Sequence, residues 1–164
     1  MRKTMQKDLI RKVVSHPIYL IAFGFGAGLS PFAPGTCGTL VAIPLYYLIQ
    51  SLSFVNYGLV LLFATLIGIW ICDVAERGIG VHDYSGIVWD EICGYGLTMW
   101  AAPKGWVWIV IGFVLFRLFD IVKPWPIALI DRKMPGGLGV MVDDLMAGVY
   151  AWIVLQLIHH FHFF

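Results

Sequence analysis

Two pairs of adjacent acidic residues are the strongest candidates for chemistry in this 164-residue sequence. Asp90–Glu91 lie near the start of one short apolar run, and Asp143–Asp144 open the last apolar run. Mg²⁺ prefers oxygen ligands and takes one or two carboxylates together with waters and substrate phosphate. Adjacent like charges repel unless a cation lies between them, so the two pairs predict a Mg²⁺ site built from all four acids. The alternative is that each acid only caps a helix N-terminus, where the helix dipole favours negative charge by about 0.3–1 kcal/mol.

A second group of charged residues lies in the segment FRLFDIVKPWPI. Arg117, Asp120 and Lys123 are three residues apart, so they share one face if the segment is helical. We expect Asp120 to join the metal site or to position groups there, and Arg117 and Lys123 to bind phosphate. Basic side chains near the headgroup layer suit an anionic lipid. A solvated ladder of ion pairs at the end of a membrane helix would give the same pattern.

The loop SPFAPGTCGT, residues 30–39, leads into an apolar helix and is a third candidate. The N-terminus of such a helix offers free backbone N–H groups to an anion. Thr36 and Thr39 add hydroxyl donors, so both are predicted to bind substrate. The same residues are also typical of a simple turn and cap, and the pattern does not separate the two interpretations.

The composition indicates the environment in which these residues work. The chain is 60% hydrophobic and only 13% charged, with a mean hydropathy of +0.83, against about 25% charged residues in a typical soluble domain. A soluble protein this apolar could not cover its surface with polar groups, so the lipid bilayer is the expected partner. The net charge is +1, and no basic face is long enough to track nucleic acid. The sequence gives no basis for an oligomeric state.

Apolar runs predict an all-α, polytopic membrane helical bundle. A membrane helix needs about 20 mostly apolar residues, with short examples near 17. Five runs are predicted to cross: 38–54, 56–73, 87–102, 105–122 and 145–163. Residues 18–29 are too short to span and are predicted to form a short interfacial or re-entrant helix. Residues 1–17 would be a basic cytoplasmic arm, residues 18–164 a single membrane-embedded domain, and residues 124–142 an irregular connection within it.

The basic residues predict an orientation for these five crossings. With the N-terminus inside, ten of the eleven Lys and Arg residues lie on the inner side, and only Lys104 lies outside, as the positive-inside rule requires. All ten acidic residues then fall at or near the inner face, which predicts an active site on the cytoplasmic face. The alternative is that the outer loops are too short to hold charges.

Two other functional classes are weaker interpretations of the acids. A small ion or proton transporter also uses acids within the membrane, but it needs polar residues near the midplane or on both sides. An enzyme that joins an alcohol to a nucleotide-activated lipid also depends on magnesium and acids. The sequence lacks the array of spaced aspartates on a single helix that such enzymes carry. Removal of a phosphate from a lipid headgroup fits the pattern better than either.

Four segments in this order resemble the bacterial phosphatidylglycerophosphatase A family: GFGAGLSPFAPGTCGTL, GVHDYSGIVWDEICG, FRLFDIVKPWPI and DRKMPGGLGVMVDDLMAG. The resemblance covers about residues 20 to 150. It implies a magnesium-dependent phosphatase of the bacterial inner membrane, active in phospholipid biosynthesis, that converts phosphatidylglycerophosphate to phosphatidylglycerol and phosphate. Together with the acid pattern, it predicts the following roles. Asp90, Glu91, Asp143 and Asp144 bind one or two Mg²⁺ ions, Asp120 is a further catalytic residue, and Thr36, Thr39, Arg117 and Lys123 bind substrate.

Overall fold

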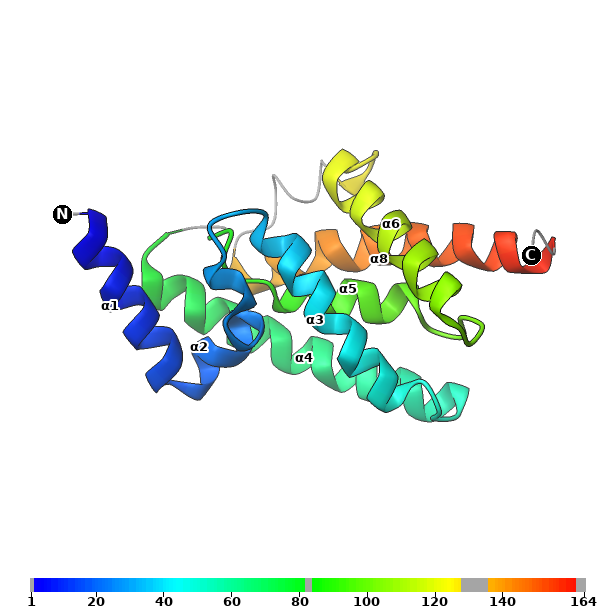
Figure 1. Ribbon diagram of the computed structural model, residues 1–164, viewed down its shortest axis with the longest axis horizontal. Coiled ribbons are helices and arrows are strands. Elements are labelled where there is room, and N and C mark those ends of the chain that lie inside the picture. The colour runs from blue at the N-terminus through cyan, green and yellow to red at the C-terminus, as the bar shows by residue number, and fades with distance from the viewer. Residues whose placement is uncertain (1, 82–83, 128–135, 162–164) are drawn as a thin grey trace.

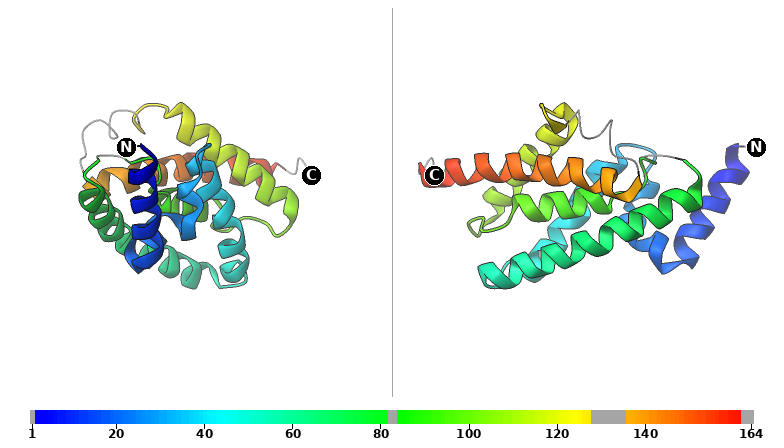
Figure 2. Two further views of the ribbon diagram at one scale, coloured as in Figure 1. Left: turned by 60° about the vertical axis from the view of Figure 1, so that its left-hand side comes forward. Right: turned by 180° about the vertical axis from the view of Figure 1, so that it is seen from behind.

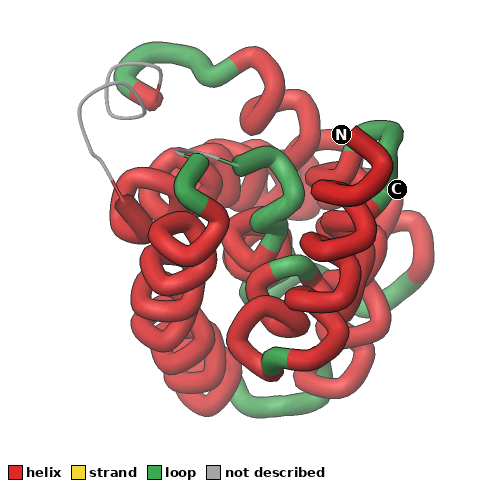
Figure 3. The backbone as a smooth tube through the Cα atoms, turned by 90° about the vertical axis from the view of Figure 1, so that its left-hand side faces the viewer, coloured by secondary structure: helices red, strands yellow, loops and turns green. Residues whose placement is uncertain are grey.

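The computed structural model describes residues 2–81, 84–127 and 136–161, and every regular element in these ranges is a helix (Figure 3). The all-α class predicted from the sequence is therefore confirmed. The chain order is α1 (Arg2–Ser15), α2 (Pro17–Ala22), the 3₁₀ helix η1 (Gly24–Leu29), α3 (Pro34–Ile49), α4 (Phe54–Ile79), α5 (Trp89–Thr98), α6 (Trp106–Val122) and α8 (Gly136–His160).

Two of the described helices, α4 and α8, are long and apolar enough to cross a membrane. They have 26 and 25 residues, whereas α3 has 16, α6 has 17 and α5 has ten. A helix rises 1.5 Å per residue, so α5 is only about 15 Å long, half of the roughly 30 Å hydrocarbon core. The prediction of about five spans is not supported. In particular, residues 99–101 of the 87–102 run form turns, and residue 102 also lies outside the helix.

Helix α5 is the centre of the bundle and packs against α3, α4, α6 and α8 (Figures 1 and 2). Its contact with α8 depends on a pair of glycines. A Cβ atom at Gly94 would lie 2.7 Å from the Asp144 carbonyl oxygen, and one at Gly148 would lie 2.5 Å from the Gly94 carbonyl oxygen. Both distances are too short for any side chain, so the two backbones touch only because these residues are glycine. Each glycine lies four residues, about one turn, after an acid, so this contact brings Asp90 close to Asp144.

The N-terminal region packs against the second half of α4. Val13 of α1, Tyr19 of α2 and Phe23 join Ile71 and Cys72 of α4 in one buried cluster. The basic arm expected over residues 1–17 is thus helical from Arg2 to Ser15 and contributes to the core. The predicted short helix over residues 18–29 is divided into α2 and η1.

Candidate active site

Helix α8 begins earlier than the sequence predicted. Its start decides whether Asp143 and Asp144 can be explained as caps of the helix N-terminus. Its first residue is Gly136, so Asp143 and Asp144 lie about two turns inside the helix at 3.6 residues per turn. The dipole effect falls off within the first turn, so capping does not explain this pair. Asp90 and Glu91 do lie in the first turn of α5, where the dipole stabilises them.

Three carboxylates from α5 and α8 converge in one place. Asp90, Glu91 and Asp144 each offer one carboxylate oxygen, and these atoms all lie within 4.8 Å of one another. Asp90 and Asp144 are buried, with 8% and 4% of their surface exposed. Glu91 is nearly as enclosed, with 13% of its side chain exposed. The spacing suits three ligands of a single divalent cation.

The remaining charged residues of the prediction surround these three acids in two ion pairs. Arg117 Nη1 lies 2.6 Å from Asp120 Oδ2 and 3.9 Å from Glu91 Oε1. Lys123 Nζ donates to Asp143 Oδ2 at 2.6 Å. Asp143 therefore faces Lys123, and it is not one of the residues in the cluster of three.

The acids and both ion pairs line one cleft of about 380 Å³. It lies between the first turns of α3 and α5, the end of α6, and the part of α8 about two turns from its start. Besides the charged residues, the cleft is lined by Ala33, Pro34, Gly35, Ser85, Ile87 and Ile121. The cleft thus combines a cluster of acids with two basic side chains, which is the arrangement that a phosphate ester bound next to a cation requires.

Two residues on the rim of this cleft have an unusual backbone conformation. Ala33 precedes α3 with φ 44°, and Lys123 ends α6 with φ 43°. Both lie in the left-handed region, which costs a residue other than glycine on the order of 1–3 kcal/mol and is concentrated at functional sites. At Lys123 this conformation ends α6 at the residue that contacts Asp143.

The cluster of three acids is electrostatically unfavourable without a cation. Burial, followed by the charge of Asp144, raises the pKa of Glu91 to about 8. Burial and the neighbouring Glu91 carboxylate also raise the pKa of Asp90 well above its usual value. Within the described residues, Glu91 Oε2 and Asp144 Oδ2 are buried and accept no hydrogen bond. Such oxygens are costly to bury, and a divalent metal ion would supply what both lack, so the residues fit a metal.

The two predicted substrate-binding threonines are placed differently from the acids. Thr39 is fully buried, and its hydroxyl donates to the Gly35 carbonyl oxygen at 3.0 Å within α3. Thr36 is partly buried, and neither threonine is among the residues that line the cleft. Their contact with substrate stays a prediction.

Gly35 and Ser85 line the cleft but were not predicted as site residues. Gly35 belongs to the 30–39 loop, which the sequence identifies as a candidate, and Ser85 belongs to the GVHDYSG part of a segment that resembles the family. The order Pro-Gly-Thr before an apolar helix was a usable signal for Gly35, because it places a residue without a side chain in the first helical turn. No comparable signal identified Ser85.

Comparisons with known proteins identify the family to which the chain belongs. The family model described as phosphatidylglycerophosphatase A matches residues 20–159, which include every predicted site residue. The chain belongs to the phosphatidylglycerophosphatase A family. The family is one of phosphatases, so the chain is an enzyme of that class.

Relatives of this phosphatase align along most of their length. A phosphatidylglycerophosphatase A of Escherichia coli K12 is 46% identical over 151 residues, 92% of this chain and 88% of the relative. One of Haemophilus influenzae is 42% identical over 147 residues, 88% and 90% of the two chains. A Bacteroides thetaiotaomicron protein, named as a candidate phosphatidylinositol-3-phosphatase, is 45% identical over 145 residues, 83% and 89% of the two chains. No solved structure shows significant similarity to the chain.

Proposed function

We propose that this phosphatase hydrolyses the phosphate monoester of phosphatidylglycerophosphate, giving phosphatidylglycerol and inorganic phosphate. The observation that carries the proposal is the buried cluster of Asp90, Glu91 and Asp144 in the same cleft as Arg117 and Lys123. The names of the Escherichia coli and Haemophilus influenzae relatives supply the substrate. The transporter alternative gains no support from the matched family or from these relatives.

The three clustered acids would hold Mg²⁺, because hard oxygen ligands and a substrate phosphate are what this ion prefers. When bound, the ion supplies a positive charge to the phosphoryl oxygens and lowers the pKa of a coordinated water. Asp143 was predicted as a fourth ligand. We propose instead that Asp143 holds the Lys123 ammonium group at the cleft, which their 2.6 Å ion pair supports.

The two basic side chains would bind the phosphate from the other wall. Arg117 and Lys123 would neutralise charge that develops on the transferring phosphoryl group. Asp120 fixes the Arg117 guanidinium through its 2.6 Å ion pair. We propose direct attack by water: its oxygen bonds to phosphorus, the bond from phosphorus to the glycerol oxygen breaks, and a proton passes to that oxygen.

We further propose that the enzyme is a multi-pass protein of the bacterial inner membrane with its cleft on the cytoplasmic face. The N-terminal region packs against the end of α4. This part of the molecule contains four basic residues: Lys7, Arg11 and Lys12 of α1 and Arg77 of α4. Lys104 precedes α6 at its opposite end from the cleft. This distribution of basic residues is that of a cytoplasmic face.

Phosphate release from purified protein in detergent tests the proposed function. With phosphatidylglycerophosphate, release is expected in Mg²⁺ and is expected to stop in excess chelator. Phosphatidylinositol-3-phosphate in the same assay tests the specificity, and we expect it to be the poorer substrate. Full release in chelator would contradict the metal requirement, and release from phosphatidylinositol-3-phosphate alone would contradict the proposed substrate.

A further inference from the structure

The first turn of α3 lies directly against the Glu91 carboxylate. Gly35, the second residue of α3, is buried. A Cβ atom at this position would lie 2.1 Å from Glu91 Oε1 and 3.1 Å from Arg117 Nη1. The first distance is far below any non-bonded contact. A side chain at position 35 and the Glu91 carboxylate would therefore compete for the same space.

The backbone at Gly35 has little freedom to move away. Thr39 donates its hydroxyl to the Gly35 carbonyl oxygen from one turn further along α3. In the same turn of α3, a Cβ at Gly38 would lie 2.6 Å from the Val88 Cβ. Helix α3 is therefore already in close contact with Val88, the residue before α5. The Glu91 carboxylate, by contrast, is the end of a flexible side chain and can move. A substituent at position 35 would displace the carboxylate rather than the helix.

We infer that Gly35 is a positioning residue for Glu91. By lacking a side chain, it lets Glu91 Oε1 rest between the first turn of α3 and Arg117, which leaves Oε2 buried and without a hydrogen-bond partner in the described structure. One oxygen of the Glu91 carboxylate lies within 4.8 Å of an oxygen of Asp90 and of Asp144. The inference rests on the proposed function, in which Glu91 is a metal ligand, and it adds what determines where that ligand lies.

Gly35→Ala tests the inference when it is combined with a shorter acid at position 91. Gly35→Ala should raise the Mg²⁺ concentration that half-protects the protein from thermal unfolding by about tenfold or more. Glu91→Asp alone should also weaken this protection, because its carboxylate no longer reaches the cluster in the same way. The double variant Gly35→Ala/Glu91→Asp should bind Mg²⁺ more tightly than Gly35→Ala, because the shorter side chain leaves room for the added methyl group.

Gly38→Ala is the matched control, because the three atoms nearest to its Cβ all belong to Val88. It should lower the Tm of the metal-free protein without changing the Mg²⁺ concentration for half-protection. A Gly35→Ala variant that behaves in the same way as this control would overturn the inference. If Gly35→Ala binds Mg²⁺ normally while Glu91→Ala does not, the inference fails and the proposed metal site stands. If Glu91→Ala also binds Mg²⁺ normally, the proposed ligand set fails.

A second comparison applies even if Gly35→Ala folds poorly. In a Glu91→Ala background the competing carboxylate is gone, so Gly35→Ala should lower the Tm much less than it does in the native background. An equal loss of Tm in both backgrounds would show that the added methyl group meets the surrounding backbone rather than Glu91. That result would also overturn the inference.

Discussion

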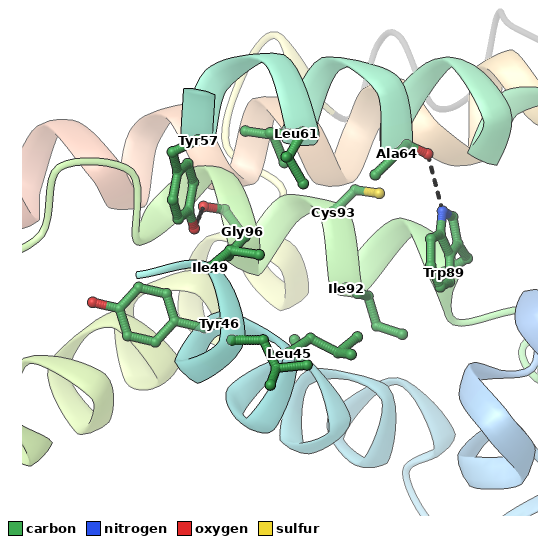
Figure 4. Close-up of a pocket in the computed structure, with 13 residues that line it drawn as sticks. Leu45, Tyr46, Ile49, Tyr57, Leu61, Ala64, Trp89, Ile92, Cys93 and Gly96 are labelled. Atoms are coloured by element: carbon green, nitrogen blue, oxygen red, sulfur yellow. Dashed lines mark hydrogen bonds between the residues drawn. The ribbon is translucent and has the colours of Figure 1, made fainter. Parts of the chain in front are cut away.

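Helix α5 separates two cavities whose chemistry is opposite. On one side lies the cleft with Asp90 and Glu91. On the other lies an apolar pocket of about 200 Å³ between α3, α4 and α5, shown in Figure 4. In that pocket Trp89 donates its indole N–H to the Ala64 carbonyl oxygen at 3.1 Å, and Tyr57 donates its hydroxyl to the Gly96 carbonyl oxygen at 2.7 Å.

The difference lies in how the polar groups of each cavity are satisfied. The pocket is lined almost entirely by apolar groups, and its Trp89 indole and Tyr57 hydroxyl both donate to backbone carbonyl oxygens. The cleft contains Glu91 Oε2 and Asp144 Oδ2, which are buried without a hydrogen bond in the described part of the chain. Buried polar atoms without hydrogen-bond partners are rare in native proteins, and a bound ion is one common reason for them. A bound cation would satisfy these two oxygens of the cleft.

Removing an acid from the cleft should have the largest effect. We expect Asp90→Ala, Glu91→Ala and Asp144→Ala each to reduce phosphate release by at least about a hundredfold, because each would remove a proposed metal ligand, while the protein still inserts and folds. Phosphate release and circular dichroism measure the two outcomes. Asp73→Ala is the control: it removes an acid that pairs with exposed Arg77 outside the cleft and should be nearly neutral. Retention of more than about a tenth of native turnover in all three cleft variants would refute the assignment.

Removing Lys123 should have a smaller and more selective effect. We expect Lys123→Ala to raise the KM for the lipid substrate by about tenfold and to change the affinity for Mg²⁺ much less, because the ammonium group is proposed to bind phosphate and not metal. Steady-state kinetics at several Mg²⁺ concentrations separate the two constants. An equal loss of both would point to a structural role for its ion pair with Asp143.

Lowering the pH should weaken Mg²⁺ binding gradually. Since burial raises the pKa of Glu91 to about 8, this carboxyl group is mostly protonated at pH 7 in the metal-free protein. Mg²⁺ requires the carboxylate, so binding releases a proton. Because the pKa of Asp90 is raised as well, the affinity should rise by about tenfold or more per pH unit from pH 6 towards pH 8. Calorimetry in buffers of different ionisation enthalpy measures the released proton, and binding without proton release at pH 7 would contradict the assigned environment of Glu91.

Filling the apolar pocket should have the smallest effect on activity. Ala64 lines the pocket away from the acids, and we expect Ala64→Leu to leave phosphate release within about twofold of the native value. Cavity filling commonly adds about 0.5–2 kcal/mol of stability, so the Tm should stay constant or rise. A loss of activity comparable to that of the cleft variants would show that the two faces of α5 are not independent.

The acids were identifiable from the sequence because charges are conspicuous in so apolar a chain. The start of α8 was not, because Gly136, Gly137 and Gly139 disfavour helix by propensity and indicated an irregular connection. Tertiary packing overrides that propensity: a Cβ at Gly137 would lie 2.1 Å from the Ile69 carbonyl oxygen of α4. Glycine at this position thus lets α8 start against α4, a contact that a local pattern does not contain.

The number of spans and the grouping of the acids also required the structure. Hydropathy merged the ten-residue α5 with the turns that follow it into one apparent span. Three of the four acids form a cluster, whereas Asp143 pairs with Lys123. This division depends on the side of α8 from which Asp143 and Asp144 each project. Adjacent helical residues point about 100° apart, so Asp143 and Asp144 have different partners although they are neighbours in sequence.

Anomalous scattering from the protein crystallised with Mn²⁺ in place of Mg²⁺ would test the central claim most directly. We predict one peak bounded by Asp90, Glu91 and Asp144, with an oxygen of each carboxylate at about 2.0–2.3 Å, a range typical of small hard divalent cations. A cleft without a peak at saturating Mn²⁺, or a peak bound by none of these three residues, would contradict the claim.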